Sequence, residues 1–152
     1  MLYRVCKSFE VESGHMLSKH PGRCRFPHGH TRRIDVVLAS PELDANDMVC
    51  DFAAIKHAVA DHIDRLDHAM AVNSADPRIE HLGSVGDRVV TFPDRDPTTE
   101  VIARGIYDFL VELIGSGRDF EGGGRRYRFP PGLVVERVRV TETSTSWAEY
   151  GR

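Results

Sequence analysis

Hydrophobic residues recur every three or four positions in two stretches of the chain, and this spacing is typical of amphipathic helices. In the first stretch the apolar positions are Phe52, Ile55, Val59, Ile63 and Leu66. Asp51 precedes them and is a suitable N-cap, because its carboxylate can accept hydrogen bonds from the free N–H groups of a first helical turn. We therefore expect a helix over residues 51–66.

A second helix is expected over residues 99–114. It begins at Thr98-Thr99-Glu100, where a hydroxyl side chain is followed by an early acidic residue, a common pattern at helix starts. The apolar positions that follow are Ile102, Ile106, Phe109, Leu110 and Leu113. They share one helical face, which should be the buried one.

Alternation of apolar and polar residues predicts strands, because neighbouring side chains of a strand point to opposite faces. The clearest case runs from Val134 to Val140. Such patterns predict strands over residues 3–13, 29–39 and 133–142. The segments 69–96 and 115–132 are expected to be long connections, the second rich in glycine, although short alternating patches at 88–92 and 126–129 could add strands.

Length and composition fit a single globular domain over residues 1–152. Hydrophobic residues make up 41% of the chain and charged residues 28%, ordinary proportions for a domain with its own core. The elements predict an α+β fold, an antiparallel sheet of about four strands with two helices on one face. A net charge of −3 argues against a protein dedicated to nucleic acid or to membrane surfaces.

Cysteine usage and the first residues predict a cytoplasmic protein. Three cysteines cannot all pair in disulfides, and none lies in a Cys-x-x-Cys motif, so a reducing compartment is expected. The first residues lack the apolar segment of a signal peptide, and no run approaches the length of a membrane-spanning helix.

His15, His28, His30 and Cys24 lie within sixteen residues and suggest a metal site. His28 and His30 would share one face of a strand, and His15 could reach them from the preceding strand. Three neutral histidines with one open position form the ligand set of a catalytic zinc ion. Cys24 could instead be a fourth ligand of a closed structural site, and the spacing leaves both alternatives open.

Asp67 and His68 form an adjacent pair at the end of the first expected helix. A carboxylate beside an imidazole can orient it and assist proton transfer, and a nearby cysteine would have a lowered thiol pKa. The alternative is a purely structural role, in which the pair caps the helix C-terminus.

Six short elements follow one another along the chain: Phe9…Gly14-His15, Cys24-x-x-x-His28-Gly29-His30, Asp51-Phe52-x-x-x-Lys56, Leu66-Asp67-His68, Pro97-Thr98-Thr99-Glu100 and Thr141-Glu142-Thr143. In this order the chain resembles the 6-pyruvoyltetrahydropterin synthase family. The three-residue gap between Cys24 and His28 is like its bacterial branch, the 6-carboxy-5,6,7,8-tetrahydropterin synthases of queuosine biosynthesis. The chain departs from the family pattern at Thr31 and Arg32, where a small polar residue and an aromatic usually follow the second histidine.

The resemblance implies a tunnelling fold (T-fold), in which three subunits join their sheets into a barrel and two such rings form a homohexamer. It also implies a lyase that converts 7,8-dihydroneopterin triphosphate to 6-carboxy-5,6,7,8-tetrahydropterin, with release of acetaldehyde and triphosphate. The alternatives are the pyruvoyl-forming reaction on the same substrate and a homologue that binds zinc or pterins without turnover.

The resemblance assigns roles to individual residues. The metal ligands for zinc would be His15, His28 and His30, and the proton-transfer residues would be Cys24, Asp67 and His68. The pterin ring would be bound by Glu142, Thr99 and Glu100. Without the resemblance, Glu142 reads as a solvent-facing strand residue, because it alternates with Val140.

Overall fold

The computed structural model describes all 152 residues. The main sheet consists of β1 (Tyr3–His15), β2 (His28–Ser40), β3 (Ala69–Asn73), β4 (Val89–Phe92), β7 (Val134–Thr143) and β8 (Ser146–Gly151). The other elements are α1 (Phe52–Asp64), α2 (Thr99–Ser116), the short helical segments η1 (Arg23–Arg25) and η2 (Pro77–Arg88), and the hairpin of β5 (Phe120–Gly122) with β6 (Arg125–Tyr127).

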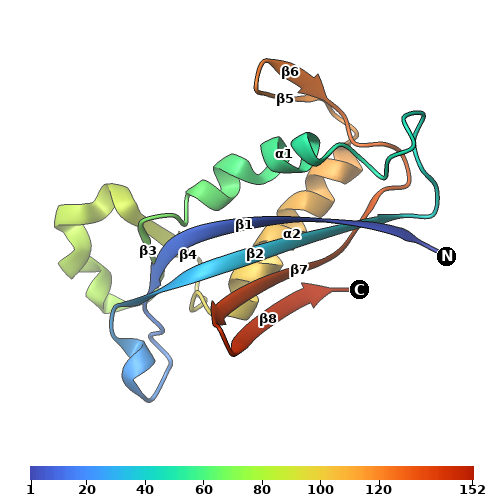
Figure 1. The fold of residues 1–152 in the computed structure, drawn as a ribbon. Helices are drawn as coiled ribbons and strands as arrows, with labels where there is room; N and C mark the ends of the chain where they lie inside the picture. Colours follow the sequence, from blue (N-terminus) through green and yellow to red (C-terminus); the bar gives the residue numbers. More distant parts are fainter.

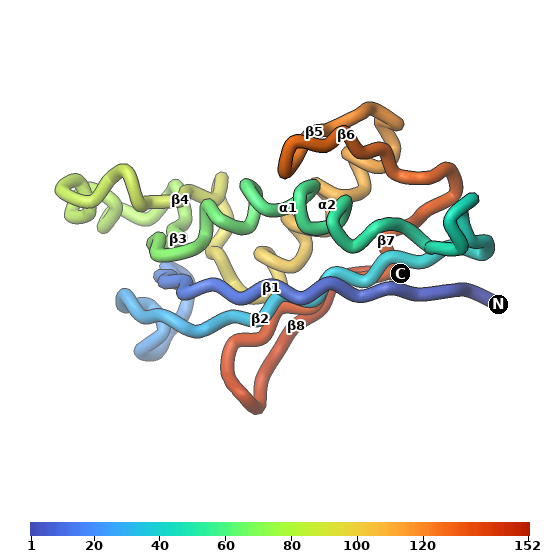
Figure 2. The backbone as a smooth tube through the Cα atoms, turned by 45° about the horizontal axis from the view of Figure 1, so that its top comes forward, coloured from blue at the N-terminus to red at the C-terminus, as the bar shows by residue number.

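The strands lie in the order β4-β3-β1-β2-β7-β8 (Figure 1). The long pair β1 and β2 is antiparallel over its whole length, from Tyr3 opposite Ser40 to His15 opposite His28. The pairs β2–β7 and β7–β8 are also antiparallel, whereas β3 runs parallel to both β1 and β4. Both helices and the β5–β6 hairpin lie on one side of the sheet (Figure 2).

The structure confirms the α+β class and corrects the expected sheet, which has six strands and is mixed. Two of the added strands come from the segment 69–96, which was expected to be mainly a connection and contains β3, η2 and β4; β4 confirms the possible strand at 88–92. The third, β8, was not expected and follows β7 at residues 146–151. In β3 four of five residues are buried, so no apolar–polar alternation marks it. The segment 115–132 likewise contains the small β5–β6 hairpin.

The helices form where their patterns predicted, with slightly different ends. The Asp51 carboxylate caps α1 by accepting from the Ala53 N–H at 2.7 Å. The Thr98 hydroxyl accepts from the Val101 N–H at the start of α2. Between the helices and the sheet lies one hydrophobic cluster, to which β2 contributes Ile34, Val36 and Leu38. No helix is both long and apolar enough to cross a membrane.

Candidate metal centre and its surroundings

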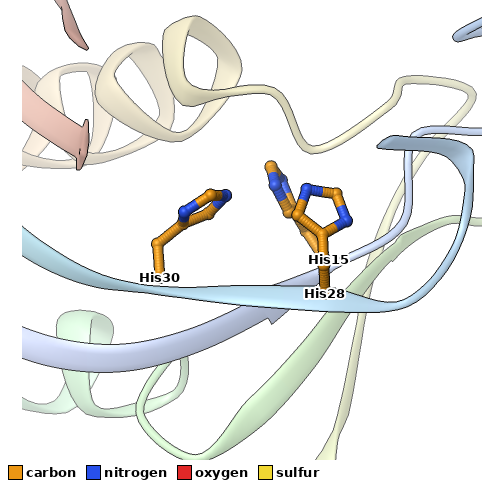
Figure 3. A group of neighbouring side chains, drawn as sticks. All are labelled: His15, His28 and His30. Carbon is orange, nitrogen blue, oxygen red and sulfur yellow. The ribbon is translucent and has the colours of Figure 1, made fainter. Parts of the chain in front are cut away.

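The pairing of β1 with β2 brings the three histidines together. His15 lies opposite His28, and the neighbouring pair on the same face is Ser13 with His30. The ring centres of His15 and His28 are 4.4 Å apart, and each lies 5.2 Å from the ring centre of His30. One ligand atom from each histidine lies within 4.8 Å of the others. Figure 3 shows the three rings on the same side of β2.

Backbone carbonyls orient two of the three rings. Nδ1 of His15 donates to the Pro97 carbonyl at 2.9 Å, and Nδ1 of His28 donates to the Phe26 carbonyl at 2.8 Å. Because a carbonyl only accepts, each Nδ1 carries the ring proton and each Nε2 keeps a lone pair. Nε2 of His28 and Nε2 of His30 are buried without a hydrogen-bond partner. Unpartnered, converging lone pairs fit a bound divalent metal such as zinc.

His15 and His30 are held in the neutral form that ligates metals. Burial lowers the pKa of His15 to about 4, and the positive charge of Arg32 acts in the same direction. The pKa of His30 is also lowered, chiefly by burial and next by Arg32. Both rings are therefore neutral at pH 7, so metal binding requires no deprotonation of either one.

Cys24 stands apart from this cluster of ligand atoms. It lies in η1 as a free, partly buried thiol, and the group that could hold a metal contains the three histidines alone. This arrangement favours three-histidine ligation with an open position over a closed Cys-His site.

Glu142 lies beside the histidines and is only partly exposed. Its Oε2 accepts a hydrogen bond from the hydroxyl of Thr99, and its Oε1 lies 3.5 Å from Nε2 of His30. Burial raises the pKa of Glu142, but the Thr99 hydrogen bond and the charge of Arg32 outweigh it, so the net pKa is lowered. Glu142 is thus an ionised acceptor next to the metal centre, while Glu100 is exposed on α2.

The structure places Arg32 in the site, whereas the sequence pattern marked it only as a departure from the family. It is fully buried and lies two residues beyond His30 on the same strand face. Its Nη1 donates to the Thr99 hydroxyl at 2.9 Å, and its Nη2 lies 3.2 and 3.3 Å from the two ring nitrogens of His15. A buried charge in an apolar strand pattern is the signal that could have identified it.

Asp67 and His68 form a hydrogen-bonded pair, 2.8 Å between Asp67 Oδ2 and His68 Nδ1. The other carboxylate oxygen accepts from the Glu12 N–H at 2.8 Å, and the pair follows the end of α1 without capping it. The Glu12 N–H and His68 lower the pKa of Asp67. The His68 side chain is 74% exposed, and no hydrogen bond joins either residue to Cys24.

One pocket lies beside the exposed pair and reaches the start of β2 at His28. It has a volume of about 490 Å³, and its lining includes His28, His68, Glu12 and Arg88. Arg88 also holds the Asp67–His68 turn by donating to the backbone carbonyls of both residues. The lining shares only His28 with the histidine cluster and only His68 with the pair.

Comparison with known proteins agrees with this geometry. A family model described as 6-pyruvoyl tetrahydropterin synthase matches residues 4–152. Relatives named 6-carboxy-5,6,7,8-tetrahydropterin synthase include one from Synechocystis, 31% identical over 98% of this chain and 93% of that protein. Another, from Aquifex aeolicus, is 29% identical over 99% of this chain and 98% of that protein.

Solved structures show the same fold at low sequence identity. A protein of Wolinella succinogenes, described as uncharacterized, superposes with a TM-score of 0.79 at 22% identity, covering 100% of this chain and 99% of that one. The 6-pyruvoyl tetrahydropterin synthase of Plasmodium vivax superposes with a TM-score of 0.68 at 15% identity, covering 100% of this chain and 98% of that one.

Proposed function

The chain belongs to the 6-pyruvoyl tetrahydropterin synthase family, and we propose that it is a zinc-dependent 6-carboxy-5,6,7,8-tetrahydropterin synthase. In this proposal 7,8-dihydroneopterin triphosphate is converted with release of acetaldehyde and triphosphate. The names of the relatives support the 6-carboxy-forming branch of the family over the pyruvoyl-forming one. The main support for a metal ion at this site is the pair of buried, unpartnered Nε2 atoms of His28 and His30 beside His15.

Zinc held by His15, His28 and His30 would supply Lewis acidity, which polarises the hydroxyl and carbonyl oxygens of the substrate side chain. The protein's own residues have separate tasks. Glu142 accepts hydrogen bonds from the amino group and ring N–H of the pterin, a match that suits the two acceptor oxygens of a carboxylate. Thr99 holds that carboxylate in place, and Glu100 at the start of α2 is a further candidate pocket residue.

Proton transfer is assigned to Cys24, Asp67 and His68. Asp67 orients His68 through their 2.8 Å hydrogen bond, and the imidazole moves a proton at the substrate side chain. Cys24 exchanges the second proton as a thiol or thiolate. Since no hydrogen bond joins Cys24 to the pair within one chain, we propose that His68 and Cys24 of different subunits serve one active site.

Two features of the sheet support an oligomer. The strands β4 and β8 are its edges, and each leaves one side of its backbone without a partner in the sheet. Joining such edges between copies would close the sheet into a ring, as in the homohexamer expected for this family. A pocket at the Asp67–His68 side would then lie near a neighbouring copy.

Product analysis tests the proposed reaction. The zinc-loaded protein is incubated with 7,8-dihydroneopterin triphosphate, and the pterin product is identified by mass spectrometry while released acetaldehyde is trapped as a hydrazone. Acetaldehyde together with the 6-carboxy product supports the proposal. A 6-pyruvoyl product without acetaldehyde would assign the other reaction of the family. Zinc and pterin binding without turnover would make the protein a non-catalytic homologue.

A further inference from the structure

Arg32 is a fully buried arginine whose charge is only partly compensated. No carboxylate lies within ion-pair distance of its guanidinium, and its Nε has no hydrogen-bond partner. Burying an incompletely paired charge costs free energy, so an apolar residue would serve the fold better at this position. This cost to the fold indicates that Arg32 has a role in the site.

The guanidinium reaches the metal centre through the His15 ring. Nη2 lies 3.2 Å from Nδ1 and 3.3 Å from Nε2 of that ring. An atom on the lone-pair axis of one ring nitrogen would be much farther from the other nitrogen. The nearly equal distances therefore place Nη2 over the ring face, a stacking contact common for arginine. The lone pair of Nε2 lies in the ring plane and stays free for a metal.

The same guanidinium reaches Glu142 through Thr99. Arginine can only donate, so the Thr99 hydroxyl must accept the bond from Nη1 at 2.9 Å. The hydroxyl has a single proton, which is then committed to Oε2 of Glu142. The direction of this relay, from Arg32 to Thr99 to Glu142, is thus set at both ends, because the arginine only donates and the ionised carboxylate only accepts. It leaves the remaining lone pairs of Glu142 for a ligand.

We propose that Arg32 is a positioning residue for ligand recognition, which orients Glu142 through Thr99 toward a ligand that carries two adjacent N–H donors. The inference rests on the proposed function, in which the pterin ring is that ligand. Without Arg32 the Thr99 oxygen loses the donor that fixes its position, and its bond to the Glu142 carboxylate holds the carboxylate plane less firmly. Arg32 also packs on His15, so the metal ligand and the ligand-binding carboxylate share one support.

The test measures binding of 6-methylpterin, which lacks the reacting side chain, to the zinc-loaded protein by calorimetry. Arg32→Met should weaken binding at least tenfold, with unchanged zinc content. Its urea unfolding midpoint should be unchanged or higher, since an incompletely paired buried charge is replaced by an apolar chain. Arg33→Met is the matched control: Arg33 is the next residue, exposed on the opposite strand face and paired with Asp35, so its affinity should equal the wild-type value.

A double-mutant cycle separates the relay from a general packing effect. Thr99→Val should also weaken 6-methylpterin binding at least tenfold, and in that background Arg32→Met should add less than twofold, because the relay is already broken. Wild-type affinity in Arg32→Met, or fully additive losses in the double variant, would overturn the proposal. If Arg32→Met does not fold, Thr99→Val decides alone, and unchanged affinity there overturns the relay.

Failure of the inference is distinguishable from failure of the proposed function. If the wild-type protein does not bind 6-methylpterin, or Glu142→Ala binds it as well as the wild type does, the pterin pocket itself is wrongly assigned. If both behave as proposed and only the Arg32→Met affinity stays at the wild-type value, the role of Arg32 alone is refuted.

Discussion

The histidine triad and the Asp67–His68 pair differ in how completely one chain builds them. The triad lies on two adjacent strands paired over thirteen residues, and His15 within it is fully buried. The pair lies on the turn between α1 and β3, with the His68 side chain 74% exposed. The proposed metal ligands are thus assembled inside the subunit, whereas the His68 side chain faces outward and no hydrogen bond joins the pair to Cys24.

The difference follows from what each chemistry requires. A metal ion needs its ligands at fixed distances, and strand pairing with buried rings provides that rigidity. A proton-transfer group needs access to substrate, and the Asp67–His68 turn is held firmly through Glu12 and Arg88 while its imidazole stays open. An exposed but well-positioned pair is well suited to complete a site across a subunit boundary.

The largest expected effect is loss of the metal when the triad is broken. His28→Ala should remove most of the zinc at neutral pH and all measurable turnover with it, because two neutral ligands hold zinc much more weakly than three. Metal analysis after dialysis measures this. His20→Ala is the control, because His20 is an exposed histidine outside the cluster and its variant should keep the metal. Equal zinc loss in Cys24→Ala would show that the cysteine is a ligand after all.

A smaller effect is expected from the proton-transfer residues, which should not touch the metal. Cys24→Ala and His68→Ala should each lower kcat by roughly 10²–10⁴-fold, the usual contribution of a positioned acid–base group, with normal zinc content. If the two residues act in one site from different subunits, mixed oligomers of the two variants should regain activity. Absence of any gain, with subunit mixing verified by mass spectrometry, would place the whole site within one chain.

Acid should destabilise the metal-free protein through the buried His15. The pKa of His15 is about 4 in the folded chain and near 6.5 when unfolded, so the unfolded state binds more protons between these values. The stability from neutral His15 is present above pH 6.5 and is lost as the pH falls toward 4. Urea unfolding should therefore show that wild type loses about 3 kcal/mol relative to His15→Gln over this range. A constant gap between wild type and His15→Gln over this range would contradict the account.

The smallest expected effect concerns recognition. Glu142→Gln replaces one acceptor oxygen with a donor, so binding of 6-methylpterin should weaken at least tenfold, consistent with a cost of about 1–3 kcal/mol for unpaired donors. Zinc content should not change, because Glu142 is outside the triad. Glu136→Gln, on the same strand and away from the histidines, should bind normally. Unchanged affinity in Glu142→Gln would show that Glu142 does not bind the pterin.

Local patterns predicted much of the fold because they report which face of an element is buried. The helices begin at Asp51 and Thr98 as their caps indicated, and the long strands lie within a few residues of the expected bounds. The strand β3 escaped prediction because it is buried on both faces, which removes the alternation that marks a half-buried strand. Its parallel pairing depends on the crossover through α1, which no local pattern records.

The sequence by itself determined that His28 and His30 share a strand face, since this follows from the two-residue period of a strand. It also marked Asp67 and His68 as adjacent partners. Only the tertiary structure decided that His15 lies opposite His28 and that Cys24 stays outside the cluster of ligand atoms. It alone joined Arg32, Thr99 and Glu142, which come from three elements, because contacts between distant segments depend on sheet register and helix packing rather than on spacing along the chain.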